Sequence, residues 1–191
     1  NIVRNMKKQK FFRYVAGMIF IFFLAGCNSS KKLETEQKSA SLIISENTTS
    51  MIDSTPKVTG IGGIFFATDD PKATKEWYGK NLGLAIDEYG SPFEFRNANR
   101  PEEINYLMWS PFKTGNEYFL PSKKEFMINY RVLHIEALVE QLKSNGVTVL
   151  DEIETYDYGK FVHIMDPDGN KIELWEPVDS VFTKMGGKTT K

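Results

Sequence analysis

Hydrophobic and polar positions alternate most clearly near the C-terminal end of the chain. Residues 161–165 and 171–175 are two short apolar-rich runs separated by Asp166-Pro167-Asp168-Gly169-Asn170. Proline presets φ, glycine accepts positive φ and Asx side chains bond to nearby backbone, so the chain should reverse there and form a β-hairpin. Alternation should place Val162, Ile164, Ile172 and Leu174 on one face. The other face should hold Phe161, His163, Met165, Glu173 and Trp175.

Two other segments have the spacing of amphipathic helices. The first follows Asp69-Asp70, an acidic N-cap with Pro71 at the first helical position, and should end at Gly83. The second should run from about His134 to Asn145, because its apolar residues lie at i, i+3, i+4 and i+7. The remaining apolar runs predict strands at residues 61–67, 84–89 continuing to 93–96, 104–109, 117–120, 125–132 and 147–157.

This order of elements reads strand, helix, three strands, and it occurs twice. A weak repeat supports the duplication, since Glu117 lies six residues after Pro111 and Glu173 lies six residues after Pro167. We therefore expect an α+β fold in which two tandem βαβββ modules form a curved mixed sheet around a shared cleft.

The N-terminal residues 1–27 have the layout of a secretory signal. From Met6, the expected initiator, basic residues precede an apolar run from Tyr14 to Leu24, and Leu24-Ala25-Gly26-Cys27 follows. The segment resembles a bacterial lipoprotein signal peptide, which implies lipidation at Cys27. A transmembrane anchor is the alternative, but the apolar run is shorter than the roughly 20 residues that span a bilayer.

The rest of the chain divides into three parts. Residues 28–57 are rich in Ser, Thr, Lys and Glu, and we expect a flexible linker with a reach of about 30 Å. The globular domain should cover residues 58–180, and residues 181–191 should be a disordered tail.

A lipid anchor would place the domain in the cell envelope, on the inner or outer membrane. The outer membrane is favoured because Asn28 rather than Asp follows the lipidated cysteine.

Composition and charge narrow the function classes. A chain of 191 residues that is 41% hydrophobic and 13% aromatic can form one domain with a substantial core. Residues 1–27 hold five of the 24 Lys and Arg and no acid, which leaves 19 basic against 25 acidic groups in the remainder. An acidic body of this kind is not expected to bind nucleic acid. The single cysteine excludes an internal disulfide.

Four stretches together resemble the vicinal oxygen chelate superfamily, the glyoxalase, bleomycin-resistance and extradiol dioxygenase group. They are DPKATKEWYGKNLGL, FMINYRV, YGKFVHIM and DPDGNKIELWEP, and the resemblance covers roughly residues 58–177. It implies a glyoxalase-like fold. It also implies metal ligands at cleft-facing positions on the first, fourth, fifth and eighth strands, with Glu173 at the last of them.

The ligand positions do not favour a metal. Alignment puts Gly63 at the first position and Met127 at the fifth-strand position, which leaves Glu117 and Glu173 as the carboxylates. Glycine has no side chain, and a thioether suits soft Cu(I) rather than a borderline divalent ion. We therefore expect no metal and no other cofactor.

Several side chains should face the cleft and affect binding rather than folding. His163 and Glu173 are the candidate catalytic pair, because an imidazole suits proton transfer near neutral pH. The candidate ligand contacts are Phe65, Glu117, Asn129, Arg131, His163, Glu173 and Trp175. Simpler interpretations remain open: His163 bonded to its neighbours, Arg131 paired with Glu117 or Glu173, the aromatic residues as core, and His134 as a solvated residue at a helix start.

Three classes of function remain. The first choice is a module resembling the bleomycin-resistance branch, which binds a small molecule in a metal-free cleft while Cys27 tethers it to the membrane. The second is a glyoxalase-like lyase or isomerase, or a dioxygenase-type enzyme, that uses Glu173 and His163. The third is a tethered scaffold, which a cleft filled by its own side chains would indicate. A homodimer is left open.

Overall fold

The structure is a computed structural model, and it describes residues 54–191. The predicted signal peptide, the lipidation site Cys27 and nearly all of the predicted linker lie outside the described residues.

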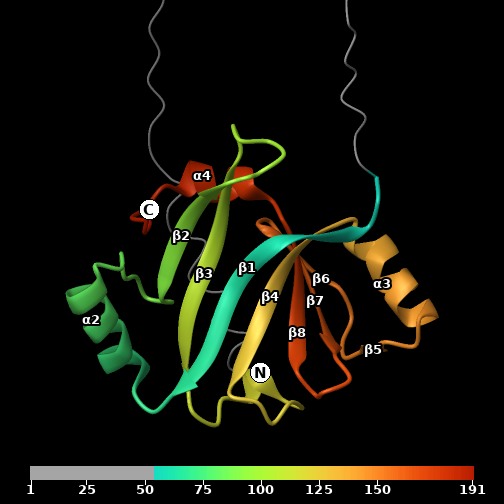
Figure 1. Ribbon diagram of the computed structural model, residues 1–191, viewed down its shortest axis with the longest axis horizontal. Coiled ribbons are helices and arrows are strands. Elements are labelled where there is room, and N and C mark those ends of the chain that lie inside the picture. The colour runs from blue at the N-terminus through green and yellow to red at the C-terminus, as the bar shows by residue number, and fades with distance from the viewer. Residues whose placement is uncertain (1–53) are drawn as a thin grey trace, which may run out of the picture. The chain divides into compact units, whose positions relative to one another are not determined.

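An eight-stranded mixed sheet forms the centre of the domain (Figure 1). Its strands are β1 (Lys57–Thr68), β2 (Ser91–Arg96), β3 (Ile104–Lys113), β4 (Phe126–Leu133), β5 (Thr148–Val149), β6 (Glu154–Tyr156), β7 (Gly159–Met165) and β8 (Lys171–Pro177). The order across the sheet is β2-β3-β1-β4-β8-β7-β5, and β6 pairs with β7. In each half the first strand pairs in parallel with a later strand, β1 with β3 and β4 with β8, and the halves meet where β1 and β4 run antiparallel. The predicted α+β fold with two halves on one curved mixed sheet is therefore confirmed, with two strands after the helix in the first half and four in the second.

Within residues 54–191, three α-helices and one 3₁₀ helix accompany the sheet: α2 (Pro71–Leu82), α3 (Ile135–Ser144), α4 (Asp179–Met185) and η2 (Glu117–Phe119). At the start of α2 the Asp70 carboxylate accepts the N–H groups of Lys72 and Ala73. The helix ends at Gly83, which has a φ of 74°, a conformation that glycine adopts without a Cβ penalty. Both ends match the predicted capping signals.

The aliphatic face of the sheet packs against α3. Helix residues Ile135, Leu138 and Val139 form one cluster with Val162, Ile164 and Leu174 of the hairpin, and Ile172 packs against it. The predicted alternation is confirmed, because His163, Glu173 and Trp175 lie on the opposite face. In Figure 1, α2 and α3 lie at opposite lateral edges of the sheet and α4 lies near one end of its strands. We call the face that carries Glu173 the concave face.

Three predicted strands differ in the structure. Residues 84–89 form no strand, because Asp87 accepts the N–H groups of Tyr89 and Gly90 and turns the chain just before β2. Residues 117–120 form η2 instead of a strand, since the Asn116 side chain accepts the N–H of Tyr118 as an N-cap. The predicted strand 147–157 divides into β5 and β6.

The prediction of a disordered tail at residues 181–191 is wrong. The segment contains most of α4, whose Phe182 packs edge-on against Trp175 with 5.6 Å between ring centroids. Further along, Thr190 donates its N–H to the Pro92 carbonyl and accepts the N–H of Glu94, so it pairs with the edge strand β2. An aromatic anchor and an open sheet edge therefore order this end of the chain.

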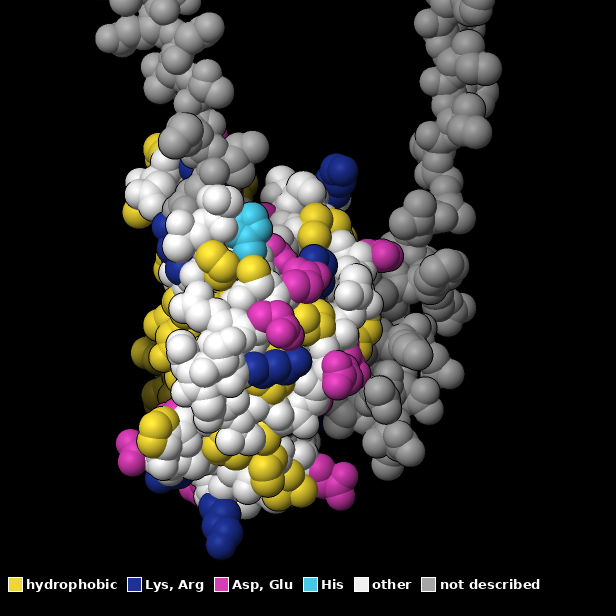
Figure 2. Space-filling model, turned by 90° about the vertical axis from the view of Figure 1, so that its right-hand side faces the viewer, with side chains coloured by type: hydrophobic (Ala, Val, Ile, Leu, Met, Phe, Trp, Pro, Cys, Tyr) yellow, Lys and Arg dark blue, Asp and Glu magenta, His cyan; other side chains and the backbone are white. Residues whose placement is uncertain are grey.

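Neither the helices nor the visible surface charge of the domain points to a particular partner. No helix formed by residues 54–191 has the length and apolarity to cross a bilayer. On the side shown in Figure 2, acidic side chains lie among basic and apolar ones. The expectation that nucleic acid is not a partner stays a prediction.

Candidate functional site

A row of polar residues crosses the centre of the concave face. Strand pairing places Asn129 of β4 opposite Glu173 of β8, and Glu173 opposite His163 of β7. On the other side of Asn129 the row continues to Gly63 of β1. Side chains from three neighbouring strands therefore meet at Glu173, and three of the predicted site residues lie together.

The Glu173 carboxylate is buried and accepts several hydrogen bonds. Its residue is 2% exposed. The Tyr118 hydroxyl of η2 donates to Oε2, the Asn129 amide donates to Oε1 at 2.7 Å, and His163 Nε2 lies 3.0 Å from Oε2. Burial raises the pKa of Tyr118 well above its usual value, and the nearby Glu173 charge raises it further. The phenol therefore keeps its proton and serves as a donor.

His163 lies between two carboxylates. Its Nδ1 is 2.6 Å from Asp151 Oδ2, and its backbone N–H donates to the other Asp151 oxygen. Burial alone would lower the pKa of His163, but the hydrogen bonds to Asp151 and Glu173 outweigh it, and the pKa is raised. Burial would raise the pKa of Asp151, yet its bonds from His163 lower it. The arrangement links a partly exposed carboxylate to a buried one through an imidazole ring.

The raised pKa of His163 predicts a dependence of stability on pH. A raised pKa in the folded state adds stability that is complete below the unfolded value of about 6.5 and is lost as pH rises through the folded pKa. Urea unfolding of the wild type should therefore show a fall in stability above about pH 6.5 that His163→Gln lacks. His134→Gln, at the other histidine of the chain, is the control and should keep the fall. An equal fall in His163→Gln would contradict this assignment.

The donor set at this centre does not fit a divalent metal. Both ring nitrogens of His163 face carboxylates rather than a common point. At Gly63 an added Cβ would lie 2.7 Å from the Phe65 ring, so the first position is already filled. The fifth-strand ligand position also differs from the predicted one, because Asn129 rather than Met127 lies in register with Glu173. Residues 54–191 contain no group of three or more His, Cys, Asp and Glu able to hold a metal ion.

An apolar cluster fills the part of the concave face beside the polar row. Met127 is fully buried and packs with Phe65 and Phe119, with Phe112 and Tyr118 against them. The Phe65 and Phe112 rings meet edge-on with centroids 5.7 Å apart. Phe65 therefore has the core role that the sequence analysis left open.

Arg131 has a partner that the sequence did not suggest. Its guanidinium pairs with Asp179 of α4, donates to the Tyr106 carbonyl at 3.1 Å and lies 5.1 Å from the centroid of the Trp175 ring. The proposed pairing with Glu117 or Glu173 is wrong. Glu117 is exposed in η2 and is not part of the polar row, because the 3₁₀ turn directs the next residue, Tyr118, toward Glu173.

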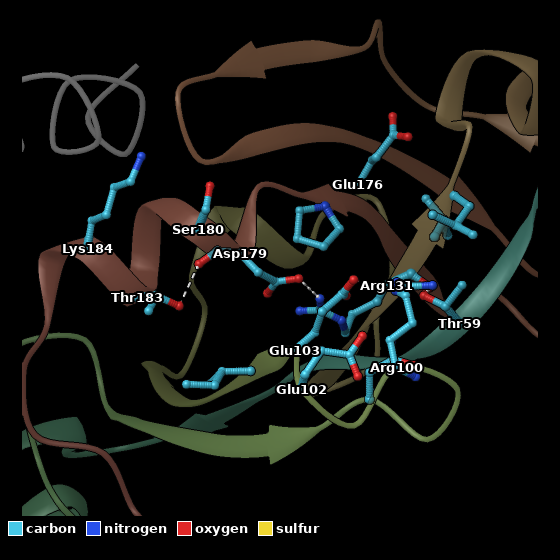
Figure 3. A pocket seen from close by; sticks show the side chains of 15 residues that line it. Thr59, Arg100, Glu102, Glu103, Arg131, Glu176, Asp179, Ser180, Thr183 and Lys184 are labelled. Carbon is cyan, nitrogen blue, oxygen red and sulfur yellow. Dashed lines mark hydrogen bonds and ion pairs between the residues drawn. The ribbon is translucent and has the colours of Figure 1, made fainter. Parts of the chain in front are cut away.

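A pocket of about 620 Å³ lies beside this pair, between α4, the loop before β3 and the ends of β1, β4 and β8 (Figure 3). Figure 3 shows the Arg131 guanidinium and the Asp179 carboxylate facing each other, with Arg100, Glu102 and Glu103 nearby. The residues that line the pocket are Thr59, Asn97, Arg100, Glu102, Glu103, Ile104, Arg131, Val132, Leu133, Glu176, Pro177, Asp179, Ser180, Thr183 and Lys184. Of the predicted ligand contacts, this lining includes only Arg131.

The sequence analysis missed three residues of these networks, Tyr118, Asp179 and Asp151. For Tyr118 the signal was Asn116, a capping residue two positions earlier that could have indicated the 3₁₀ turn. Asp179 opens a short segment with Asp in its first turn and an apolar residue at Phe182, which could have indicated α4. Asp151 stands between short strands, and no local pattern distinguishes it.

Two halves joined at β1 and β4, with a polar row on the concave face, define the class of domain. The family model described as Glyoxalase/Bleomycin resistance protein/Dioxygenase superfamily matches residues 60–174, more than half of the chain. The chain belongs to this superfamily.

The solved structures that resemble this chain include methylmalonyl-CoA epimerases from two organisms. Methylmalonyl-CoA epimerase from Mycobacterium tuberculosis is 22% identical, with 66% of this chain and 93% of that chain covered and a TM-score of 0.43. A variant of the Streptomyces coelicolor epimerase in complex with 2-nitronate-propionyl-CoA is 18% identical, with coverages of 64% and 99% and a TM-score of 0.48. A superfamily member from Vibrio splendidus 12B01 is 15% identical, with coverages of 64% and 99% and a TM-score of 0.39. A comparison with curated proteins gave no significant match.

Proposed function

We propose that the protein is a membrane-tethered module that binds a small molecule, without a metal, in the pocket beside α4. The observation that carries the proposal is the pocket itself, whose volume of about 620 Å³ is typical of small-molecule sites. It combines apolar walls at Ile104, Val132 and Leu133 with convergent polar groups. Such a combination gives a ligand both buried area and fixed orientation.

The centre of the concave face is less suited to a ligand. Glu173, Asn129 and Met127 are each at most 2% exposed, and Glu173 has internal hydrogen-bond partners. An added Cβ at Gly62 would lie 2.2 Å from Asn129 Oδ1, so there is little space over this strand. We therefore propose the pocket beside α4, rather than the centre of the concave face, as the binding site.

A glyoxalase-like enzyme is the second candidate, and one observation favours it. The hydrogen-bonded series of side chains Asp151, His163 and Glu173 could pass a proton between solvent and the buried Glu173 carboxylate. None of these three residues lines the pocket. A substrate would therefore have to reach the buried Glu173 carboxylate by displacing Tyr118 or Asn129.

The pocket can be tested with a panel of small amines, alcohols, carboxylates and sugars added to ¹⁵N-labelled protein. Binders should shift NMR signals of residues that line the pocket. Ser180→Trp should abolish the shifts, because Ser180 lines the pocket on α4 and an indole there fills it. Ser144→Trp, at an exposed helical serine of α3, is the matched control and should leave binding unchanged. Binders that shift the signals of His163 and Glu173 instead of the pocket-lining residues, or that still bind Ser180→Trp, would overturn the proposed site.

The tether rests on the sequence around Cys27 and has its own test. Replacing Cys27 with Ser should move the protein from the membrane fraction to the soluble fraction and abolish labelling by a fatty-acid analogue, because no thiol remains to be acylated. Ser29→Ala is the neighbouring control and should change neither result. Retention of Cys27→Ser on membranes would contradict the lipid anchor.

A further inference from the structure

The ring of Phe182 lies between three other aromatic rings. Its centroid is 5.6 Å from that of Trp175 in β8, 5.6 Å from that of Tyr106 in β3 and 6.1 Å from that of Tyr158 in the turn before β7. The contacts with Trp175 and Tyr158 are edge-to-face, a geometry that favours an aromatic ring over an aliphatic group of the same size. We call the space bounded by Tyr106, Tyr158 and Trp175 the ring slot.

The ring slot is separate from the pocket beside α4. None of the three slot residues lines the pocket, whereas Asp179, Ser180, Thr183 and Lys184 of α4 do. The helix therefore turns Phe182 toward the slot and its polar side chains toward the pocket.

A few specific contacts hold α4 in place. None of its seven residues, all of them within the described part of the chain, is buried. At the start of the helix Asp179 pairs with Arg131. Beyond its end Thr190 pairs with β2, and its hydroxyl lies 2.8 Å from the Ser91 hydroxyl. A helix this short has little stability of its own, so these contacts and Phe182 determine whether it stays against the sheet.

Two features lower the free-energy cost of lifting α4. Asp179 Oδ1 is buried without a hydrogen-bond partner among residues 54–191, and it would regain water in an open position. Gly186 and Gly187 follow the helix with φ values of 65° and 118°, and glycine allows the chain to change direction there with little steric cost. The closed position thus carries a local penalty that an open position relieves.

We propose that residues 179–191 form a strap that closes the ring slot from within, and that the slot takes the aromatic ring of a ligand when the strap lifts. Phe182 is then an internal competitor for the slot. The ligand class is small aromatic compounds, because three rings surround the slot and the group that fills it is itself a phenyl ring. Since the slot is not part of the pocket, failure of the proposed pocket function would leave this assignment intact.

Native-state hydrogen exchange tests whether the strap opens by itself. The N–H groups of Val181, Gly186 and Thr190 are hydrogen-bonded to the carbonyls of Val178, Phe182 and Pro92. They should exchange faster than the amides of β8, and low concentrations of urea should hardly change their exchange, because a local opening exposes little surface. Strap amides that exchange as slowly as β8, with the urea dependence of global unfolding, would overturn the proposal.

Phenol and cyclohexanol test the ligand class, because they share a six-membered ring and a hydroxyl and differ in aromaticity. In the wild type phenol competes with Phe182 for the slot, so it should speed exchange of the strap amides by about threefold or more and leave α3 unchanged. In Phe182→Ala the slot is empty, so phenol should fill it under the closed strap and slow the exchange. Cyclohexanol should act much more weakly in both proteins.

The opposite signs separate competition for the slot from a general denaturing effect, which would speed exchange in both proteins. Phe126→Ala, at an exposed ring of β4 outside the slot, is the matched control and should respond to phenol as the wild type does. Phenol that speeds exchange in both the wild type and Phe182→Ala, or in neither, would contradict the slot.

Phe182→Leu replaces Phe182→Ala if the alanine variant does not fold. Leucine keeps an apolar side chain but has no ring, so it competes less well for the slot. Phenol should therefore speed exchange of the strap in Phe182→Leu more than in the wild type, and an equal or smaller response would overturn the proposal.

Discussion

Replacing Glu173 with alanine is expected to destabilise the domain by about 3–5 kcal/mol, the usual effect of removing one partner of a buried ion pair. The substitution leaves the Tyr118 hydroxyl and the Asn129 amide without their acceptor and removes one of the two carboxylates beside His163. Each buried donor that loses its partner costs about 1–3 kcal/mol. Urea unfolding at pH 6 measures the change.

Two comparisons make the Glu173 result interpretable. Glu152→Ala, at an exposed carboxylate, should alter stability by less than about 0.5 kcal/mol. Glu173→Gln should lie between the two, because it keeps a side chain of similar shape but loses the charge that faces His163. A mild effect of Glu173→Ala would return Glu173 to the role that the sequence suggested, a free carboxylate that meets a ligand.

The sequence predicted well those parts of the fold that local signals determine. The Asp70 cap, the Gly83 stop and the alternation along residues 161–165 and 171–175 each rest on a few neighbouring residues. Local preference and tertiary packing agree at these positions, so each element could be recognised without its neighbours. The resemblance to the superfamily then gave the arrangement of the two halves.

The partners of the polar side chains were harder to predict, because they depend on register and on distant contacts. Alternation correctly grouped Met127, Asn129 and Arg131 on one face of β4, yet it could not say which of them lies beside Glu173. The parallel pairing of β4 with β8 sets that position, because its register puts Asn129 opposite Glu173. A shift along a strand changes every cross-strand neighbour.

The order of the C-terminal segment also depends on distant contacts that the sequence does not reveal. Residues 181–191 give only a weak helical signal in sequence, and the three-dimensional structure shows Phe182 beside Trp175 and Thr190 beside β2. Because α4 also supplies Asp179, the error over the tail concealed the true partner of Arg131. The missed helix therefore hid the pocket beside α4 as well.

The Arg131–Asp179 pair should give the second large effect. Arg131→Met is expected to cost about 3–5 kcal/mol, because it leaves the Asp179 carboxylate partly buried without its cation. Burial already raises the pKa of Asp179 against the opposing effect of Arg131, so loss of the arginine should raise it further. Urea unfolding of the single variants Arg131→Met and Asp179→Leu and of the double variant measures the pair as a double-mutant cycle.

The double variant should be much closer to the wild type than either single variant, because two apolar side chains can replace a buried ion pair at little net cost. Its stability then reports how firmly Phe182 alone holds α4 against Trp175. A matched cycle of Arg131→Met with Glu173→Ala should show a smaller coupling, since Arg131 pairs with Asp179 while Glu173 accepts from Tyr118 and Asn129. If the coupling to Glu173 were instead the larger one, Arg131 would belong to the polar row, and the pocket beside α4 would lose the wall on which its proposed function depends.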